Sequence, residues 1–255
     1  MPDPIPQVTG TGQEFMELTR YRYLGPSDQE KGLPQPPLEL PPAPGYPMIE
    51  LENPQDIAIP PLDIRTAIER RHSVRSYVRE PLSLLELSFL LWCTQGVRHV
   101  HSTAATFRTV PSAGARYAFE TFLLINELSG LEPGLYRYLA LSHRLQLVSA
   151  EPDIHIRIAH GFMDQDFVMR CGAAFLWTAV SYRMTWRYGE RGYRDLLLDE
   201  GHVCQNLYLA AEAIGCGVCA LAAFDDDLMA AILGIDGRDH FMIYGATVGK
   251  KGNGP

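Results

Sequence analysis

The spacing of apolar residues after position 60 predicts four helices. Apolar side chains recur there every three or four residues, over 62–68, 84–95, 193–214 and 226–233. Ser83 and Glu86 stand three apart before the second of these segments, the spacing of a capping box. Gly215 and Gly234 follow the last two segments, where a C-terminal glycine ends a helix. These boundaries therefore rest on both periodicity and capping residues.

Shorter apolar runs between these helices predict strands. They cover 120–126, 135–139, 144–148, 173–182, 217–222 and 241–248. The 135–139 and 144–148 runs follow the Pro133-Gly134 turn and are spaced as an antiparallel hairpin. The 173–182 run is apolar throughout, which suits the centre of a sheet. The pattern as a whole predicts an α+β fold, with helices flanking a mostly antiparallel central sheet.

The first 60 residues have a different character. Of the 19 prolines in the chain, 14 lie within the first 61 residues. They are concentrated in 33–47, where they prevent regular helix or sheet interiors. Scattered tyrosine, leucine and methionine side chains make this segment more apolar than a solvated tail. We therefore divide the chain into an extended arm, 1–60, and a domain, 61–255. The arm is expected to wrap over its own domain or a partner subunit, and a disordered tail is the alternative.

Composition removes several classes of function. The 255 residues are 46% hydrophobic and 20% charged, which is typical of a globular protein, and the net charge of −8 disfavours nucleic acid as a partner. The apolar stretch 207–224 contains Glu212 and two glycines, so we interpret it as a helix running into a strand and expect no membrane association. No targeting segment is visible at the start, which predicts a cytoplasmic protein with five reduced cysteines.

A cluster of arginines opposes the negative charge of the whole chain. Five arginines and His72 lie between Arg65 and Arg79, with a single acidic residue among them. The order Arg71-His72-Ser73-Val74-Arg75 offers two guanidinium groups and a hydroxyl to one anion, and a phosphate monoester fits. A solvated helix end is the alternative interpretation.

Other segments add weaker signals. Lys250 and Lys251 are two of only three lysines, and they would close a phosphate site if the last strand lies beside the arginine cluster. Pro111-Ser112-Ala113-Gly114 and the Ala222-Ala223 pair are small enough for a ligand to approach the backbone. An ordinary turn, a core strand and a solvated tail are the alternatives. We predict no metal site, because Cys216 and Cys219 would point to opposite faces of a strand.

Taken together, these segments resemble the nitroreductase superfamily of FMN enzymes, and within it the SagB-type, thiazoline-oxidase-like dehydrogenases. The resemblance covers about 15–251. Its markers, in order, are RRHSVRSY (70–77), LLWCTQGV (90–97), PSAGARYAFE (111–120), the segment 186–217 and ALAAFDDD (220–227). Each motif is weak alone, but their order and spacing together are specific.

The resemblance implies a nitroreductase-like fold that forms a homodimer with FMN at the interface. It implies that Arg71, Ser73 and one or both of Lys250 and Lys251 hold the FMN phosphate. His72 and Arg75 would lie along the ribityl chain, with Arg75 close to flavin N1, where its charge stabilises the reduced ring. The remaining implied contacts are the packing of Pro111, Ser112, Ala113 and Gly114 on the flavin and a backbone N–H of Ala222 or Ala223 at N5.

One position departs from the family pattern. The family's azoline oxidation uses a Lys-Tyr pair, and the matching residues here are Arg187 and Tyr188. Arginine stays protonated at neutral pH and cannot act as a base, which puts azoline oxidation in doubt. Arg187 either anchors an anionic substrate or is structural, and Tyr188 remains a candidate acid.

We therefore expect an FMN-dependent oxidoreductase of the SagB dehydrogenase type, acting on a small-molecule or peptidic substrate. One alternative is a nitro or quinone reductase that takes electrons from NAD(P)H. A second is a flavin-binding protein without turnover, and a third is a protein that keeps only the fold. Substrate specificity is expected on 97–110 and 160–190, where no residue pattern indicates a particular substrate.

Overall fold

The computed structural model describes residues 10–101 and 105–252. Its centre is a seven-stranded sheet in which every neighbouring pair is antiparallel. The strands in spatial order are β1 (Met48–Glu50), β8 (Arg144–Ser149), β7 (Gly134–Leu139), β5 (Phe119–Ile125), β9 (Ala173–Val180), β11 (His240–Lys250) and β10 (Cys216–Leu221). This confirms the predicted α+β class, with the apolar β9 in the interior of the sheet.

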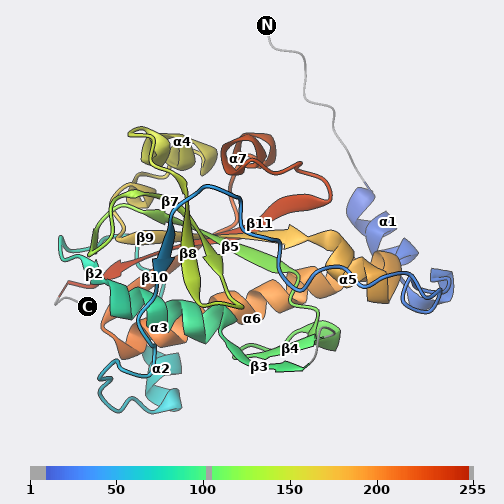
Figure 1. Ribbon diagram of the computed structural model, residues 1–255, viewed down its shortest axis with the longest axis horizontal. Helices are drawn as coiled ribbons and strands as arrows, with labels where there is room; N and C mark the ends of the chain where they lie inside the picture. Colours follow the sequence, from blue (N-terminus) through green and yellow to red (C-terminus); the bar gives the residue numbers. More distant parts are fainter. Residues whose placement is uncertain (1–9, 102–104, 253–255) are drawn as a thin grey trace, which may run out of the picture.

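Helices cover both faces of this sheet (Figure 1). Helices α3 (Leu84–Gln95) and α6 (Gly192–Ala213) lie on one face, and α4 (Ile154–Gly161) and α7 (Asp226–Leu233) lie on the other. Each face has its own apolar core, and the period-two alternation of the strands divides the side chains between them. Cys216 packs into the first core and Cys219 into the second, so the two thiols lie on opposite sides of the sheet.

Smaller elements complete the chain. The arm contains α1 (Thr11–Leu18) and η1 (Tyr21–Tyr23), and α2 (Ile64–Arg70) follows β1 in the chain. The strand pairs are β2 (Leu82–Ser83) with β6 (Leu128–Ser129), and β3 (Val97–His101) with β4 (Ala105–Arg108). The remaining helices are η2 (Ala113–Ala115), η3 (Asp166–Val168), α5 (Ser181–Tyr188) and η4 (Gly189–Arg191).

Local sequence signals located most boundaries well. The capping box of Ser83 and Glu86 is present, and α7 ends at Gly234, whose φ of 67° favours glycine. The 207–224 stretch is indeed the end of α6 followed by β10, and no helix within the described ranges has the length and hydropathy to cross a membrane. The prediction for 173–182 was wrong at its end. The strand stops at Val180, where Ser181 bonds to the carbonyl of Asp239 and α5 begins.

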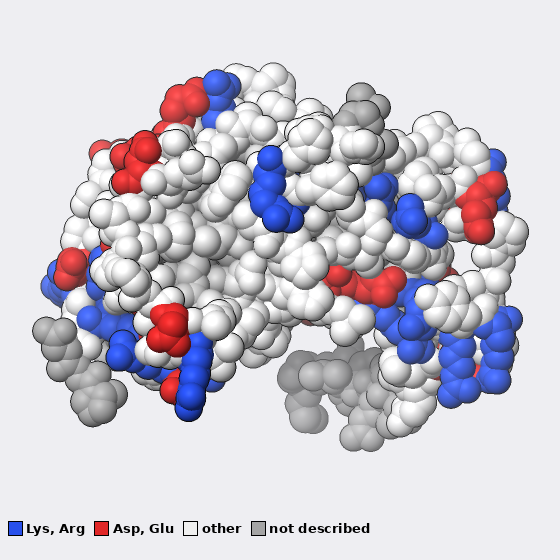
Figure 2. Space-filling model, turned by 90° about the horizontal axis from the view of Figure 1, so that it is seen from below, with Lys and Arg blue, Asp and Glu red and all other residues white. Residues whose placement is uncertain are grey.

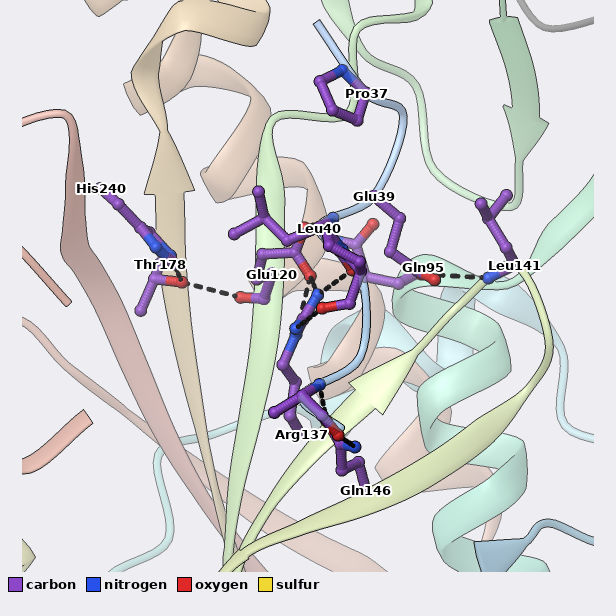
Figure 3. Close-up of polar contacts among 12 residues, drawn as sticks. Pro37, Glu39, Leu40, Gln95, Glu120, Arg137, Leu141, Gln146, Thr178 and His240 are labelled. Atoms are coloured by element: carbon purple, nitrogen blue, oxygen red, sulfur yellow. Dashed lines mark hydrogen bonds and ion pairs between the residues drawn. The ribbon is translucent and has the colours of Figure 1, made fainter. Parts of the chain in front are cut away.

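The proline-rich segment lies in an extended form across the sheet of its own domain (Figure 3). Glu120 of β5 accepts the N–H of Leu40, and Arg137 of β7 donates to the carbonyl groups of Leu40 and Pro41. Gln146 of β8 both donates to and accepts from the backbone of Ala43, at 2.7 and 2.9 Å. Side chains of the sheet therefore satisfy a backbone that its prolines keep out of regular pairing.

Candidate functional site

The arginine segment packs against α6 and β10. The Arg71 guanidinium lies 5.3 Å from the centre of the Tyr208 ring, and the hydroxyl groups of Ser73 and Tyr208 are 3.1 Å apart. The Tyr208 hydroxyl also accepts the N–H of Ala220 in β10, at 2.9 Å. One tyrosine of α6 therefore holds the arginine segment beside the strand that leads to Ala222.

Backbone contacts fix this segment further. Val74 donates its N–H to the carbonyl of Val218 at 2.9 Å. A Cβ on Gly217 would lie only 2.6 Å from Cβ of Val74, so the close approach requires glycine there. Arg71 and Arg75 form no ion pair with any carboxylate in the described parts of the chain. Their charges are thus available to an external anion, and His72 lies between them, exposed.

The last strand lies beside the arginine segment, which is the arrangement that a phosphate site closed by the two lysines requires. Val78 donates its N–H to the carbonyl of Lys250, at 3.1 Å. The two ammonium groups, however, already have carboxylate partners, since Lys250 pairs with Glu86 of α3 and Lys251 pairs with Glu212 of α6. The lysines are therefore near the expected position, but their charges are shared with acidic residues.

Ala222 and Ala223 follow β10 directly and are exposed. The carbonyl of Ala223 accepts a hydrogen bond from Gln165 at 3.4 Å. No side chain longer than a methyl group projects from these two residues, so a flat ligand could approach their backbone. The structure thus places this pair in the continuation of the strand that Tyr208 and Val74 contact.

The 111–114 segment lies at a different point along α6. The N–H of Ala113 donates to both carboxylate oxygens of Asp199 at 3.1 Å, and Ser112 accepts the N–H of Tyr117 at 2.9 Å. Gly114 has a φ of 56°, and a Cβ there would lie 2.5 Å from the Tyr188 hydroxyl oxygen and 2.8 Å from Arg187 Cδ. The structure therefore brings this segment, Arg187 and Tyr188 together.

The predicted residues form two groups within one chain. Asp199, which holds the 111–114 segment, and Tyr208, which holds the arginine segment, are nine residues apart on α6. At 1.5 Å per residue this separates the two groups by about 14 Å along the helix. Sequence reasoning missed Asp199 and Tyr208 as the residues that hold the two groups, because their role appears only through contacts with distant segments.

Sequence reasoning also missed a buried acid next to Asp199. Glu200 is 2% exposed, and neither of its carboxyl oxygens has a hydrogen-bond partner among the residues that the structure describes. Burial, and then the charge of Asp199, raise the pKa of Glu200 well above its ordinary value of 4.5. The folded protein therefore keeps Glu200 protonated at pH values where the unfolded chain has released that proton.

This burial predicts a pH-dependent stability. Above about pH 4.5 the native state binds one more proton at Glu200 than the unfolded state, so this group makes folding less favourable as the pH rises. We expect Glu200→Gln to gain stability relative to the wild type by up to about 1.4 kcal/mol per pH unit between pH 5 and 7. Urea unfolding at several pH values measures this, with the exposed Glu190→Gln as control. A pH-independent difference would contradict the assignment.

Comparison with known proteins agrees with this architecture. The model of the nitroreductase family matches residues 68–250. A Methanocaldococcus jannaschii protein named as a nitroreductase is 33% identical over 183 residues, covering 71% of this chain and 90% of that protein. The trifolitoxin-processing protein TfxB of Rhizobium leguminosarum bv. trifolii is 29% identical over 133 residues, covering 51% of this chain and 36% of that protein.

The fold has the same relatives. A solved structure from Anabaena variabilis, described as a nitroreductase, superimposes with a TM-score of 0.66 at 26% identity, covering 82% of this chain and 42% of that one. The sequence match begins within α2 and ends with β11, so it includes both groups of candidate residues apart from Lys251. This chain therefore belongs to the nitroreductase family of oxidoreductases.

Proposed function

We propose that the protein is an FMN-dependent oxidoreductase of the SagB dehydrogenase type, acting on a small or peptidic substrate. The observation that carries this proposal is the arginine segment, where Arg71 and Arg75 flank Ser73 without carboxylate partners in the described chain. Guanidinium groups and a hydroxyl are the donors that a phosphate monoester prefers. The similarity to a trifolitoxin-processing protein supports a peptidic substrate.

The residues present fit FMN. Arg71 and Ser73 would hold the phosphate, His72 and Arg75 would follow the ribityl chain, and the backbone at Ala222 and Ala223 would face the ring. The cofactor supplies two-electron redox chemistry when bound. Lys250 and Lys251 could contribute to the phosphate site only by sharing or leaving their carboxylate partners. The two arginines are therefore the main cations of the proposed site.

A homodimer would unite the two groups of site residues. The 111–114 segment of one subunit could meet the arginine segment of the other. Within one chain, the α6 residues that hold these two segments lie about 14 Å apart along the helix. Leu197 and Leu198 of α6 are 61% and 64% exposed, which is unusual for large apolar side chains. Figure 2 shows the molecule from below, the side on which α3 and α6 cover the sheet in Figure 1, with a broad white area that contains one basic side chain near its middle and an acidic group to the right of it. This face is the proposed dimer surface.

Arg187 and Tyr188 have separate roles in this proposal. The Arg187 Nε donates to the Tyr188 hydroxyl oxygen at 3.2 Å, which leaves the phenolic proton free to point away from arginine. Tyr188 is thus the candidate proton donor to substrate, and Arg187 is the candidate anchor for a substrate anion. A guanidinium group has no acceptor, so the Tyr188 hydroxyl cannot donate its proton to Arg187.

Flavin uptake tests the proposal directly. We expect the purified protein to show the visible absorbance of bound flavin, and native mass spectrometry to find two FMN per dimer. A colourless protein that takes up no FMN at micromolar concentration would refute it.

Steady-state oxidation of NAD(P)H with nitrofurazone distinguishes the proposed dehydrogenase from the second candidate, a nitroreductase activity that the Methanocaldococcus relative favours. Slow turnover supports the dedicated dehydrogenase, and fast turnover supports the reductase.

A further inference from the structure

The arm and the end of α5 line an open cavity, and the arm residues in it have no role in the function proposed above. Its volume is about 410 Å³, which is in the range of small-ligand sites. The arm contributes one wall, including Tyr21, Leu24 and Glu30, and α5 contributes Arg187 and Tyr188 to the other. The cavity is therefore adjacent to the candidate proton donor.

The arm wall is tied firmly to α5. Gln29 donates its N–H to the carbonyl of Trp186 at 2.9 Å, and the indole N–H of Trp186 donates to the carbonyl of Leu33 at 3.0 Å. One turn earlier, the Tyr182 hydroxyl donates to Asp28 at 3.2 Å. Trp186 directly precedes Arg187, so these contacts set the distance between the arm and the cavity's cation.

Opposite charges line this one cavity. Arg187 is exposed and has no carboxylate partner within the described ranges. Gly114 packs directly against its side chain. Glu30 accepts the N–H and the hydroxyl of Ser27 at 2.7 and 3.0 Å, and has no cationic partner in the described chain. Hydrogen bonds from the backbone and then the side chain of Ser27 lower the pKa of Glu30, so its carboxylate stays charged.

The remaining surface is apolar or aromatic. Tyr21, which lines the cavity, is 72% exposed, and the Arg191 guanidinium lies 4.5 Å from the centre of its ring and restrains it. Leu24 of the arm and Tyr188 of α5 also line the cavity. A bound molecule would therefore meet one cation, one anion and two phenol rings.

We propose that this cavity binds an amino-acid-like, zwitterionic part of the substrate. Its carboxylate would pair with Arg187, its ammonium group with Glu30, and its apolar side chain would pack on Tyr21 and Leu24. The inference rests on the proposed function, because it places the substrate beside Tyr188. It also makes the arm, and not the flavin-binding domain alone, a determinant of specificity.

Three related probes test this assignment on the full chain after incubation with FMN. Phenylalanine carries both charges, phenylalaninamide lacks the carboxylate and N-acetylphenylalanine lacks the ammonium group. We expect calorimetric titration to show phenylalanine binding about tenfold more tightly than either analogue. Glu30→Gln should weaken phenylalanine about tenfold and leave N-acetylphenylalanine unchanged. Arg187→Gln should do the same while leaving phenylalaninamide unchanged.

Glu14→Gln, in α1 of the same arm and outside the cavity, is the matched control and should change no affinity. Equal affinity for all three probes, no binding of any probe, or an equal loss in Glu14→Gln overturns the inference. Flavin absorbance measured on the same samples keeps the two proposals distinct. Flavin uptake without the probe pattern overturns only this inference, and the probe pattern without flavin overturns only the proposed function.

Discussion

Glu120→Gln is expected to lower the free energy of unfolding by about 3–5 kcal/mol, because it leaves two buried guanidinium groups without a counter-charge. The Glu120 carboxylate is 2% exposed and pairs with both Arg183 and Arg137, whose side chains are 2% and 10% exposed. Burial alone would raise the pKa of Glu120, but the charges of Arg183 and Arg137 outweigh it and hold that pKa below its ordinary value. The native state therefore depends on the ionised form.

Guanidinium chloride unfolding measures this loss, and Glu50→Gln is the matched control. Glu50 lies on β1 and pairs with Arg144, but its side chain is 72% exposed, so its loss should cost less than about 1 kcal/mol. Glu120 also accepts the N–H of Leu40, so the variant should expose the arm to proteolysis near residues 37–43. Equal destabilisation by the two substitutions would show that the buried ion pairs of Glu120 with Arg137 and Arg183 stabilise the fold no more than an exposed ion pair does.

Arg71→Ala is expected to weaken FMN binding about 10- to 100-fold, the loss of a charge-assisted hydrogen bond to phosphate. The same substitution should change the affinity for riboflavin, which lacks the phosphate, by less than about threefold. Fluorescence titration with both flavins measures the two constants. The comparison separates a phosphate contact from a general disturbance of Tyr208, on whose ring Arg71 lies.

Arg65→Ala is the control for this experiment. Arg65 lies in α2, which ends directly before Arg71, and its side chain is 85% exposed and pairs with Glu69, so its removal should leave both affinities unchanged. Equal losses for FMN and riboflavin in Arg71→Ala would assign Arg71 to packing, and the phosphate would have to bind elsewhere. The lysines would then be the next candidates, and Glu86→Gln would test whether Lys250 becomes more available.

Local pattern was sufficient for most of the secondary structure. The α3 capping box and the α7 boundaries depend on residues within one turn of each other, so neighbouring positions contain the whole signal. The elements that sequence analysis left unassigned are short, such as α5 and the β3–β4 hairpin, and a short element shows too few repeats for its period to be recognised. Sequence analysis placed substrate specificity partly on 160–190, the segment that contains α5. The ligand of the cavity at the end of α5 is a proposal.

Composition and short-range periodicity were enough to predict the α+β class, six of the seven strands of the central sheet, four of the helices and a cationic arginine segment in an acidic chain. Which of these charges are available depends on contacts between segments that are far apart in the chain. Lys250 and Glu86 are 164 residues apart, and Arg183 and Glu120 are 63 apart, yet each pair is in contact. Sheet pairing and helix packing bring such groups together, and no local pattern specifies the partner of a charge.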